Sequence, residues 1–309
     1  MVNKVNSPLR YPGGKSKLTT YVEHLLDIND INGTYIEPFA GGAGIAINLI
    51  LSGRVEKIVI NDLDVSVFSF WYHVKNNPQK LINKIKKVPF STKGTKLSPE
   101  ELIEYWDITK RLYLKSRGSN TVDEAFTFFM LNRMNISGII SGGPIGGRKQ
   151  NGEYNVTVRF NKDDLIKRIE KIAEFGERII VQNLDAVSFI QNVINSSIIT
   201  KNSFLFVDPP YFFQGRNLYP SYIDSREHNL IANILQSNPK LKWIETYDMS
   251  KQISDYYSTD EVNKYVYNLQ YSAMRKRKAS ELMFSSKNIN LESFDNVQLQ
   301  RLEFNEVLL

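Results

Sequence analysis

The sequence predicts an α/β protein, in which a doubly wound sheet is interrupted by a mainly helical insertion. The first observation is the order strand, glycine turn, helix, strand near the N-terminus. The second is the return of alternating strand and helix patterns in the last third of the chain, and the third is a basic helical stretch between these parts. We therefore expect one α/β domain from residues 1–74 and 165–290, an insertion at 75–164, and an unassigned C-terminal extension at 291–309.

The first part of the chain is predicted from short apolar runs and their stop signals. Residues 35–37 and 58–60 are strand-like, and the apolar run 45–51 between them is typical of a helix that ends at Ser52-Gly53. A further helix begins near Val65. This order is the start of a doubly wound sheet.

The predicted insertion differs in charge from the rest of the chain. Residues 75–118 contain eleven basic and four acidic side chains, a net charge of +7, whereas the whole chain carries +6. A charge run of this kind is a DNA-facing surface or only the solvated face of helices, and the pattern leaves both open. Further along the chain we expect helices at 122–135, 163–175, 229–237 and 251–257, a glycine-rich loop at 138–152, and strands at 178–182, 203–207 and 241–246.

Composition excludes several kinds of chemistry. The chain has no cysteine, which excludes disulfides, thiolate metal sites and cysteine nucleophiles. Its three histidines are scattered, so we expect no metal. The basic balance is compatible with a nucleic-acid partner. Because there is no signal peptide and no apolar run of about 18 residues, we expect a cytoplasmic protein with no membrane partner.

A glycine turn and a carboxylate predict a nucleoside-type ligand site. The turn, residues 37–44, follows the first strand, and Asp62 follows the next strand 18 residues after Gly44. Glycines allow a sharp bend and a close approach of the backbone to a ligand at the carboxyl edge of a sheet. A carboxylate at this distance typically holds ribose hydroxyls. An ordinary strand–helix turn is the alternative reading.

The motif Asp208, Pro209, Pro210 and Tyr211 follows the apolar strand 203–207 and therefore faces the same edge. An amino group conjugated to a heteroaromatic ring is a poor nucleophile because its lone pair is delocalised. A carboxylate and a backbone carbonyl that accept its two hydrogens favour a localised lone pair, and the prolines fix the direction of that carbonyl. Tyr211 offers a face on which a base can stack.

Together these segments resemble the Dam-like S-adenosylmethionine-dependent DNA adenine methyltransferases. The resemblance rests on residues 35–44 and 208–211, on Leu9-Arg10-Tyr11-Pro12-Gly13-Gly14-Lys15, and on Leu131-Asn132-Arg133 followed by 152–156. It implies a Rossmann-like methyltransferase sheet with an inserted target-recognition subdomain. It also implies direct in-line methyl transfer to the exocyclic amino nitrogen of a flipped adenine in double-stranded DNA, which leaves S-adenosylhomocysteine.

The resemblance assigns roles by position. Asp208, Pro209, Pro210 and Tyr211 are the catalytic residues that hold the target adenine. Tyr11 and Lys15 contact the methionine part of the cofactor, Asp62 its ribose and Asp185 its adenine. The expected cofactor-binding residues are Tyr11, Lys15, Glu37, Pro38, Phe39, Ala40, Gly41, Gly42, Gly44, Asp62, Asp185 and Asp208.

The expected DNA contacts come from the insertion and from a basic tetrad near the C-terminus: Asn132, Arg133, Ile136, Ser137, Ser141, Arg148, Lys149, Arg275, Lys276, Arg277 and Lys278. Relatives that modify GATC typically have an arginine where this chain has Ser141, and a serine cannot make a bidentate contact to guanine. We therefore expect a different recognition sequence. Ile136 or Ser137 is expected to fill the space of the flipped base.

Two alternatives remain open at this stage, and a third is disfavoured by its motif spacing. The first is methylation of the cytosine exocyclic amino group, for which Ser-Pro-Pro-Tyr is the more usual motif. The second is a non-catalytic DNA-binding relative that kept the fold. The third, a P-loop ATPase suggested by Gly14-Lys15-Ser16, fails the full spacing because residue 9 is Leu. We also expect a monomer or weak dimer, and a cognate restriction endonuclease as a partner of a restriction-modification system.

Overall fold

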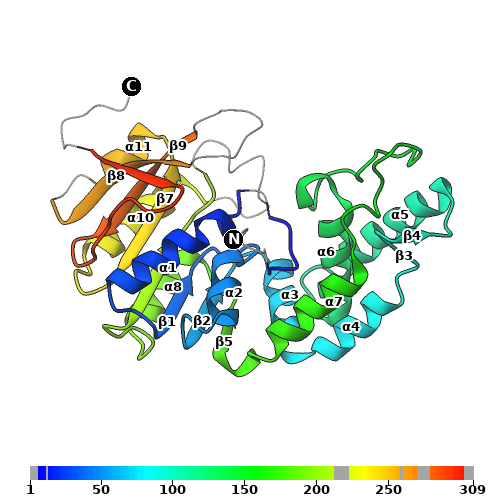
Figure 1. Ribbon diagram of the computed structural model, residues 1–309, viewed down its shortest axis with the longest axis horizontal. Coiled ribbons are helices and arrows are strands. Elements are labelled where there is room, and N and C mark those ends of the chain that lie inside the picture. The colour runs from blue at the N-terminus through cyan, green and yellow to red at the C-terminus, as the bar shows by residue number, and fades with distance from the viewer. Residues whose placement is uncertain (1–5, 12, 212–222, 258–259, 270–278, 303–309) are drawn as a thin grey trace.

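The computed structural model describes residues 6–11, 13–211, 223–257, 260–269 and 279–302 (Figure 1). Within these residues the centre of the molecule is one eight-stranded sheet. Its strands, in spatial order, are β10 (Val297–Arg301), β8 (Val262–Leu269), β9 (Ala279–Ser286), β7 (Trp243–Asp248), β6 (Ser203–Val207), β1 (Thr34–Glu37), β2 (Lys57–Asn61) and β5 (Ile179–Gln182).

The order in which the chain adds strands to the sheet reverses between β1 and β6. Strands β7, β6, β1, β2 and β5 are parallel, while β9, β8 and β10 pair antiparallel beyond β7. From β1 the chain runs outward to β2, and it returns to the other side of β1 as β6. In doubly wound sheets ligands bind at such a switch point, outside the carboxyl ends of the strands. The topology therefore directs attention to the ends of β1 and β6.

Apolar side chains cover both faces of the parallel strands. Tyr35 and Ile58 belong to one core cluster, whereas Ile36 and Val59, one residue further along each strand, belong to the other. Helices α1 (Thr19–Ile28) and α2 (Gly44–Leu51) contribute to the first cluster. Helices α8 (Ala186–Ile194), α10 (Ser225–Gln236) and α11 (Lys251–Tyr256) contribute to the second. This period-two burial confirms the fully buried strands expected from their apolar runs.

A helical lobe stands beyond the β5 edge of the sheet (Figure 1). It consists of α3 (Val65–Asn76), α4 (Pro78–Lys86), α5 (Pro99–Ser116), α6 (Val122–Met134) and α7 (Lys162–Ala173), with a small hairpin of β3 (Phe90–Ser91) and β4 (Gly94–Thr95). Helix α6 packs on α3 and α5, and α4 packs on α7. Short 3-10 helices occupy Ser16–Leu18, Ile136–Gly138 and Gly176–Arg178.

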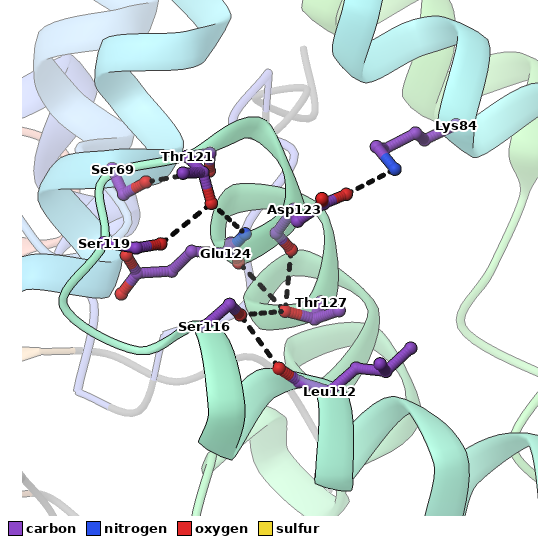
Figure 2. A network of polar contacts seen from close by, with 9 residues as sticks. All are labelled: Ser69, Lys84, Leu112, Ser116, Ser119, Thr121, Asp123, Glu124 and Thr127. Carbon is purple, nitrogen blue, oxygen red and sulfur yellow. Dashed lines mark hydrogen bonds and ion pairs between the residues drawn. The ribbon is translucent and has the colours of Figure 1, made fainter.

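A polar network joins four helices of this lobe (Figure 2). The hydroxyl of Thr121 caps α6 by accepting the backbone N–H of Glu124, while the hydroxyl of Ser69 donates to the carbonyl of Thr121. Lys84 of α4 forms an ion pair with Asp123. The fully buried Glu124 carboxylate accepts the hydroxyl of Ser66 and the N–H groups of residues 118 and 120, each at 2.8 Å. These contacts fix the turn between α5 and α6 against α3.

The predicted α/β class is confirmed. The expected helices and strands occur in the predicted order, but α1, α8, β8 and β9 are absent from the sequence-based prediction. Two further differences concern the start of α10 and the C-terminal extension. Helix α10 begins at Ser225, four residues earlier than the apolar pattern indicates, because Asp224 and Glu227 form a capping box. Part of the C-terminal extension at 291–309 is a sheet strand, β10, which pairs with β8. Among the described residues, no helix combines the length and the apolar character needed to cross a membrane.

Candidate active site

A cavity of about 390 Å³ opens at the carboxyl ends of β1 and β6, at the switch point of the sheet. Four segments that are far apart in the sequence form most of its lining: residues 7, 9–11 and 13–16 (with Pro8, here called the N-terminal segment), the glycine turn 37–45, residues 61–63 after β2, and residues 208–211 after β6. Of the predicted cofactor residues, those that line it are Tyr11, Lys15, Glu37, Pro38, Phe39, Ala40, Gly41, Gly42, Gly44, Asp62 and Asp208.

The glycine turn is shaped around the Tyr11 ring. Gly41 has a φ of 46°, and a Cβ added to it would lie 2.6 Å from the ring. Glycine is therefore needed at this position for its backbone conformation and for space. The hydroxyl of Ser7 also donates to the carbonyl of Gly42 at 2.5 Å. Both contacts hold the N-terminal segment over the turn.

Asp62 holds the glycine turn by a hydrogen bond to Gly41. Its carboxylate accepts the N–H of Gly41 at 2.8 Å and the N–H of Asp64 at 2.9 Å, while Trp71 donates its indole N–H to the carbonyl of Gly41 at 2.9 Å. Burial, followed by the nearby Asp64, raises the pKa of Asp62 to about 7. A carboxylate has about four acceptor positions, so Asp62 can still accept a ligand hydroxyl.

Glu37, the last residue of β1, is a second buried carboxyl in the cavity wall. It accepts the Tyr35 hydroxyl at 3.0 Å and the N–H of Ala46 at 3.3 Å, both on Oε1. Burial raises its pKa to about 8 despite these two donors. A nearby cation would favour its charged form. The site is therefore suited to a ligand that carries positive charge.

Asp208 forms an ion pair with Lys15 across the cavity. The ammonium of Lys15 lies 2.8 Å from Asp208 Oδ1, and the hydroxyl of Thr246 donates to the same oxygen at 2.8 Å. Burial raises the pKa of Asp208, while Lys15 opposes that shift. Burial also opposes the charge on Lys15, but Asp208 and Glu281 raise the pKa of the lysine well above its usual range. The two carboxylates thus favour the charged form of Lys15 in this pocket.

The other residues of the catalytic motif line the cavity, whereas Asp185 lies beside it. Pro209, Pro210 and Tyr211 line the cavity together with Asp208. Asp185 instead caps helix α8, where its carboxylate accepts the N–H of Ser188 at 2.8 Å. Its neighbours Leu184 and Ala186 line the cavity. Asp185 is therefore placed beside the cavity, with one oxygen committed to the helix.

The predicted DNA residues of α6 are largely committed to contacts within the protein. Asn132 is buried and bonds to the N–H and carbonyl of Arg10 at 2.8 and 2.6 Å and to the carbonyl of Gly138 at 3.0 Å. Arg133 donates to the carbonyls of Arg159 and Pro8. Burial, followed by neighbouring arginines, lowers the pKa of Arg133 to about 9. Both side chains tie the N-terminal segment to the helical lobe.

The loop after α6 carries the more accessible candidates. Ile136 is 56% exposed, and Ser137, which lines the cavity, adopts a left-handed backbone with φ 56°. Ser141, Arg148 and Lys149 are exposed. The guanidinium of Arg148 is held by both carboxylate oxygens of Asp107 at 3.1 and 2.6 Å. The basic tetrad at 275–278 lies outside the described residues.

Two residues at the site, Thr246 and Glu281, are missing from the sequence-based prediction. Thr246 reaches Asp208 from β7, and Glu281 reaches Tyr211 and Lys15 from β9. The strand 241–246 was expected, but a threonine in it carries no signal of its own. Residues 262–267 are rich in β-branched and aromatic side chains, which is a strand signal, but nothing in them indicates that the strand pairs with residues 279–286.

Several known proteins are similar to this chain. The modification methylase StsI of Streptococcus sanguinis is 28% identical over 223 residues, which are 67% of this chain and 29% of that protein. The type II methyltransferase M.MjaIII of Methanocaldococcus jannaschii is 25% identical over 216 residues, which are 66% of this chain and 68% of that protein. The rRNA methyltransferase AviRa of Streptomyces viridochromogenes is a solved structure with 12% identity and a TM-score of 0.37, matched over 90% of this chain and 87% of its own.

A family model covers most of the chain. It matches residues 11–276, which include the glycine turn, Asp62, the helical lobe and the 208–211 motif. The resemblance seen in the motifs is thereby confirmed, and the chain belongs to the D12 class of N6 adenine-specific DNA methyltransferases.

Proposed function

We propose that this protein methylates the exocyclic amino nitrogen of adenine at a specific sequence in double-stranded DNA, with S-adenosylmethionine as the donor. The observation that carries the proposal is the position of Asp208, Pro209, Pro210 and Tyr211 in the wall of a cavity that the glycine turn and Asp62 also line. The family membership supports adenine over cytosine as the target base.

The cavity fits the cofactor. S-adenosylmethionine supplies a methyl group on a positively charged sulfur. Asp62 is proposed to hold the ribose hydroxyls, because it lines the cavity and keeps acceptor capacity. Tyr11, Lys15 and residues 37–44 surround the methionine part, and Glu37 offers a carboxyl whose pKa, raised by burial, falls when a cation binds nearby. Asp185 is proposed to accept a hydrogen bond from the adenine, through the carboxylate capacity that the cap of α8 leaves.

Asp208 is proposed to accept hydrogens of the target amino group. Among the described residues, Lys15 and Thr246 both contact its Oδ1, which leaves Oδ2 for the substrate. The carbonyl that follows accepts the second hydrogen, and its direction is fixed by the two prolines. The nitrogen lone pair then points at the methyl group for in-line displacement, and rate comes from positioning and electrostatics. Because the amino group is inaccessible within a duplex, the adenine must leave the base stack.

The DNA is proposed to lie across the N-terminal segment and the loop 136–149. Ser137 lines the cavity and its neighbour Ile136 is exposed, and one of the two is proposed to fill the space of the flipped base. Arg148 and Lys149 are exposed for base or phosphate contacts, and the tetrad 275–278 is proposed to add phosphate contacts. Asn132 and Arg133 hold this surface in shape. We propose that the protein acts as a monomer or weak dimer beside a cognate restriction endonuclease.

A direct assay tests the activity. The protein is incubated with duplex DNA and labelled S-adenosylmethionine, and the nucleosides are analysed. We expect the label in N6-methyladenine. We expect Asp208→Ala to lose transfer by about 100-fold or more while keeping cofactor binding, since one positioned polar group is worth that much. The matched control is Asp255→Ala, whose exposed carboxylate contacts only Lys251 among the described residues.

The same reaction tests the target sequence. Methylation of an oligonucleotide library, with mapping of the modified adenines, identifies the site. We expect a sequence other than GATC, because Ser141 cannot contact guanine in the bidentate manner. Label in methylcytosine or no label in DNA would reject the proposed activity, and modification confined to GATC would reject only the expectation about sequence.

A further inference from the structure

A buried carboxylate from the antiparallel part of the sheet reaches the catalytic motif. Glu281 lies in β9, three strands away from β1 (Figure 1). Its side chain is only 10% exposed, and Lys15, 3.7 Å away, is the cation that faces it. A buried carboxylate is costly unless it is paired and hydrogen-bonded. Its presence beside Tyr211 therefore calls for a role.

Glu281 and Lys15 both contact the hydroxyl of Tyr211. The hydroxyl of Tyr211 donates to Glu281 Oε1 at 2.8 Å and accepts the ammonium of Lys15 at 3.2 Å. The same ammonium lies 4.9 Å from the centre of the Tyr211 ring. The Tyr211 hydroxyl is thus held by a carboxylate and by a cation together, which restricts the orientation of the ring.

The carboxylate is itself held by its strand partner. Tyr267 of β8 pairs directly with Glu281 in the antiparallel register. The buried hydroxyl of Tyr267 donates to Glu281 Oε2, so each carboxylate oxygen accepts one phenol. Directly opposed residues of an antiparallel pair have side chains on the same face, which explains why this contact forms. The hairpin therefore delivers Glu281 in a fixed orientation.

We propose that Glu281, fixed by Tyr267, is a positioning residue for methyl transfer: it holds the Tyr211 ring in the plane against which the target adenine stacks. This inference rests on the proposed function. Glu281 acts through Tyr211 and touches no reacting atom. The hairpin β8–β9 thus becomes part of the catalytic apparatus, although its residues lie outside the motifs on which the family resemblance rests.

The test separates positioning from general folding by a double-mutant cycle. In single-turnover assays with saturating DNA and cofactor, we expect Glu281→Ala to slow transfer by about 100-fold, the scale of a misplacement of about 1 Å. Glu281→Gln keeps an acceptor for the Tyr211 hydroxyl and is expected to restore most of that rate. Tyr211→Phe removes the hydroxyl through which Glu281 acts. In that background, Glu281→Ala should slow transfer by less than about threefold further, because the effects of coupled contacts are not additive.

Controls make each outcome decisive. Glu261→Ala changes an exposed glutamate at the other end of the same hairpin and should keep the wild-type rate. If Glu281→Ala fails to fold, Tyr267→Phe replaces it in the cycle, with an expected loss of about 10-fold. A wild-type rate for Glu281→Ala, or rate losses that multiply in the double variant, would overturn the inference. All of these rates are compared with adenine methylation by the wild-type protein. If the wild-type protein does not methylate adenine, it is the proposed function that fails, and this is seen before any variant is compared.

Discussion

The substitution Asn132→Asp tests whether Asn132 organises the site from within the protein. The change is nearly isosteric, so it leaves packing intact. The aspartate can still accept the N–H of Arg10, but it cannot donate to the carbonyls of Arg10 and Gly138, which the amide reaches at 2.6 and 3.0 Å. An unmade buried hydrogen bond costs about 1–3 kcal/mol, so the loss of two donors is expected to lower the free energy of unfolding by roughly 3 kcal/mol.

Urea unfolding followed by tryptophan fluorescence measures this change at neutral pH. The matched control is Asn76→Asp, an exposed amide whose single contact with the described residues is the carbonyl of Tyr72, and we expect a change below about 0.5 kcal/mol there. If Asn132→Asp unfolds with the same free energy as Asn76→Asp, the reasoning is wrong and the side chain is free to face DNA instead.

Two further predictions concern pH and salt. Burial lowers the pKa of His228 to about 4 in the folded protein, so between about pH 6.5 and 4 the unfolded chain binds one more proton than the folded protein. The free energy of unfolding should therefore fall by roughly 3 kcal/mol as the pH drops through this window. His228→Gln should make the free energy of unfolding less dependent on pH over the same range. Parallel curves for the two proteins would contradict this. In DNA-binding titrations, Arg148→Ala should reduce the steepness of log affinity against log salt concentration by about 1, whereas the control Lys251→Ala should leave it unchanged. An unchanged slope for Arg148→Ala would show that Arg148 contacts no phosphate.

The catalytic edge of the sheet could be predicted from the sequence because its signals are local. Glu37 is the last residue of the first strand, Asp62 and Asp208 each directly follow an apolar strand, and parallel strands end at the same edge. The structure places all three in one cavity wall. Their meeting point follows from strand direction alone, without knowledge of any tertiary contact.

What escaped prediction depends on burial and on distant pairing. Asn132 and Arg133 stand in a segment that resembles a DNA-reading motif, and nothing in their neighbours tells that their side chains turn inward to residues 8–10. Glu281 is an ordinary glutamate in sequence. It becomes informative only when the register of β8 and β9 sets it opposite Tyr267.

The position of Lys15 has a consequence for synthesis of the protein. Its partners Asp208 and Glu281 follow it by 193 and 266 residues, so most of the chain must be made before both partners can pair with it. A ribosome adds about 5–20 residues each second, and contacts between distant residues form last because closing the loop costs entropy. The pocket is therefore completed only after β9 has left the ribosome.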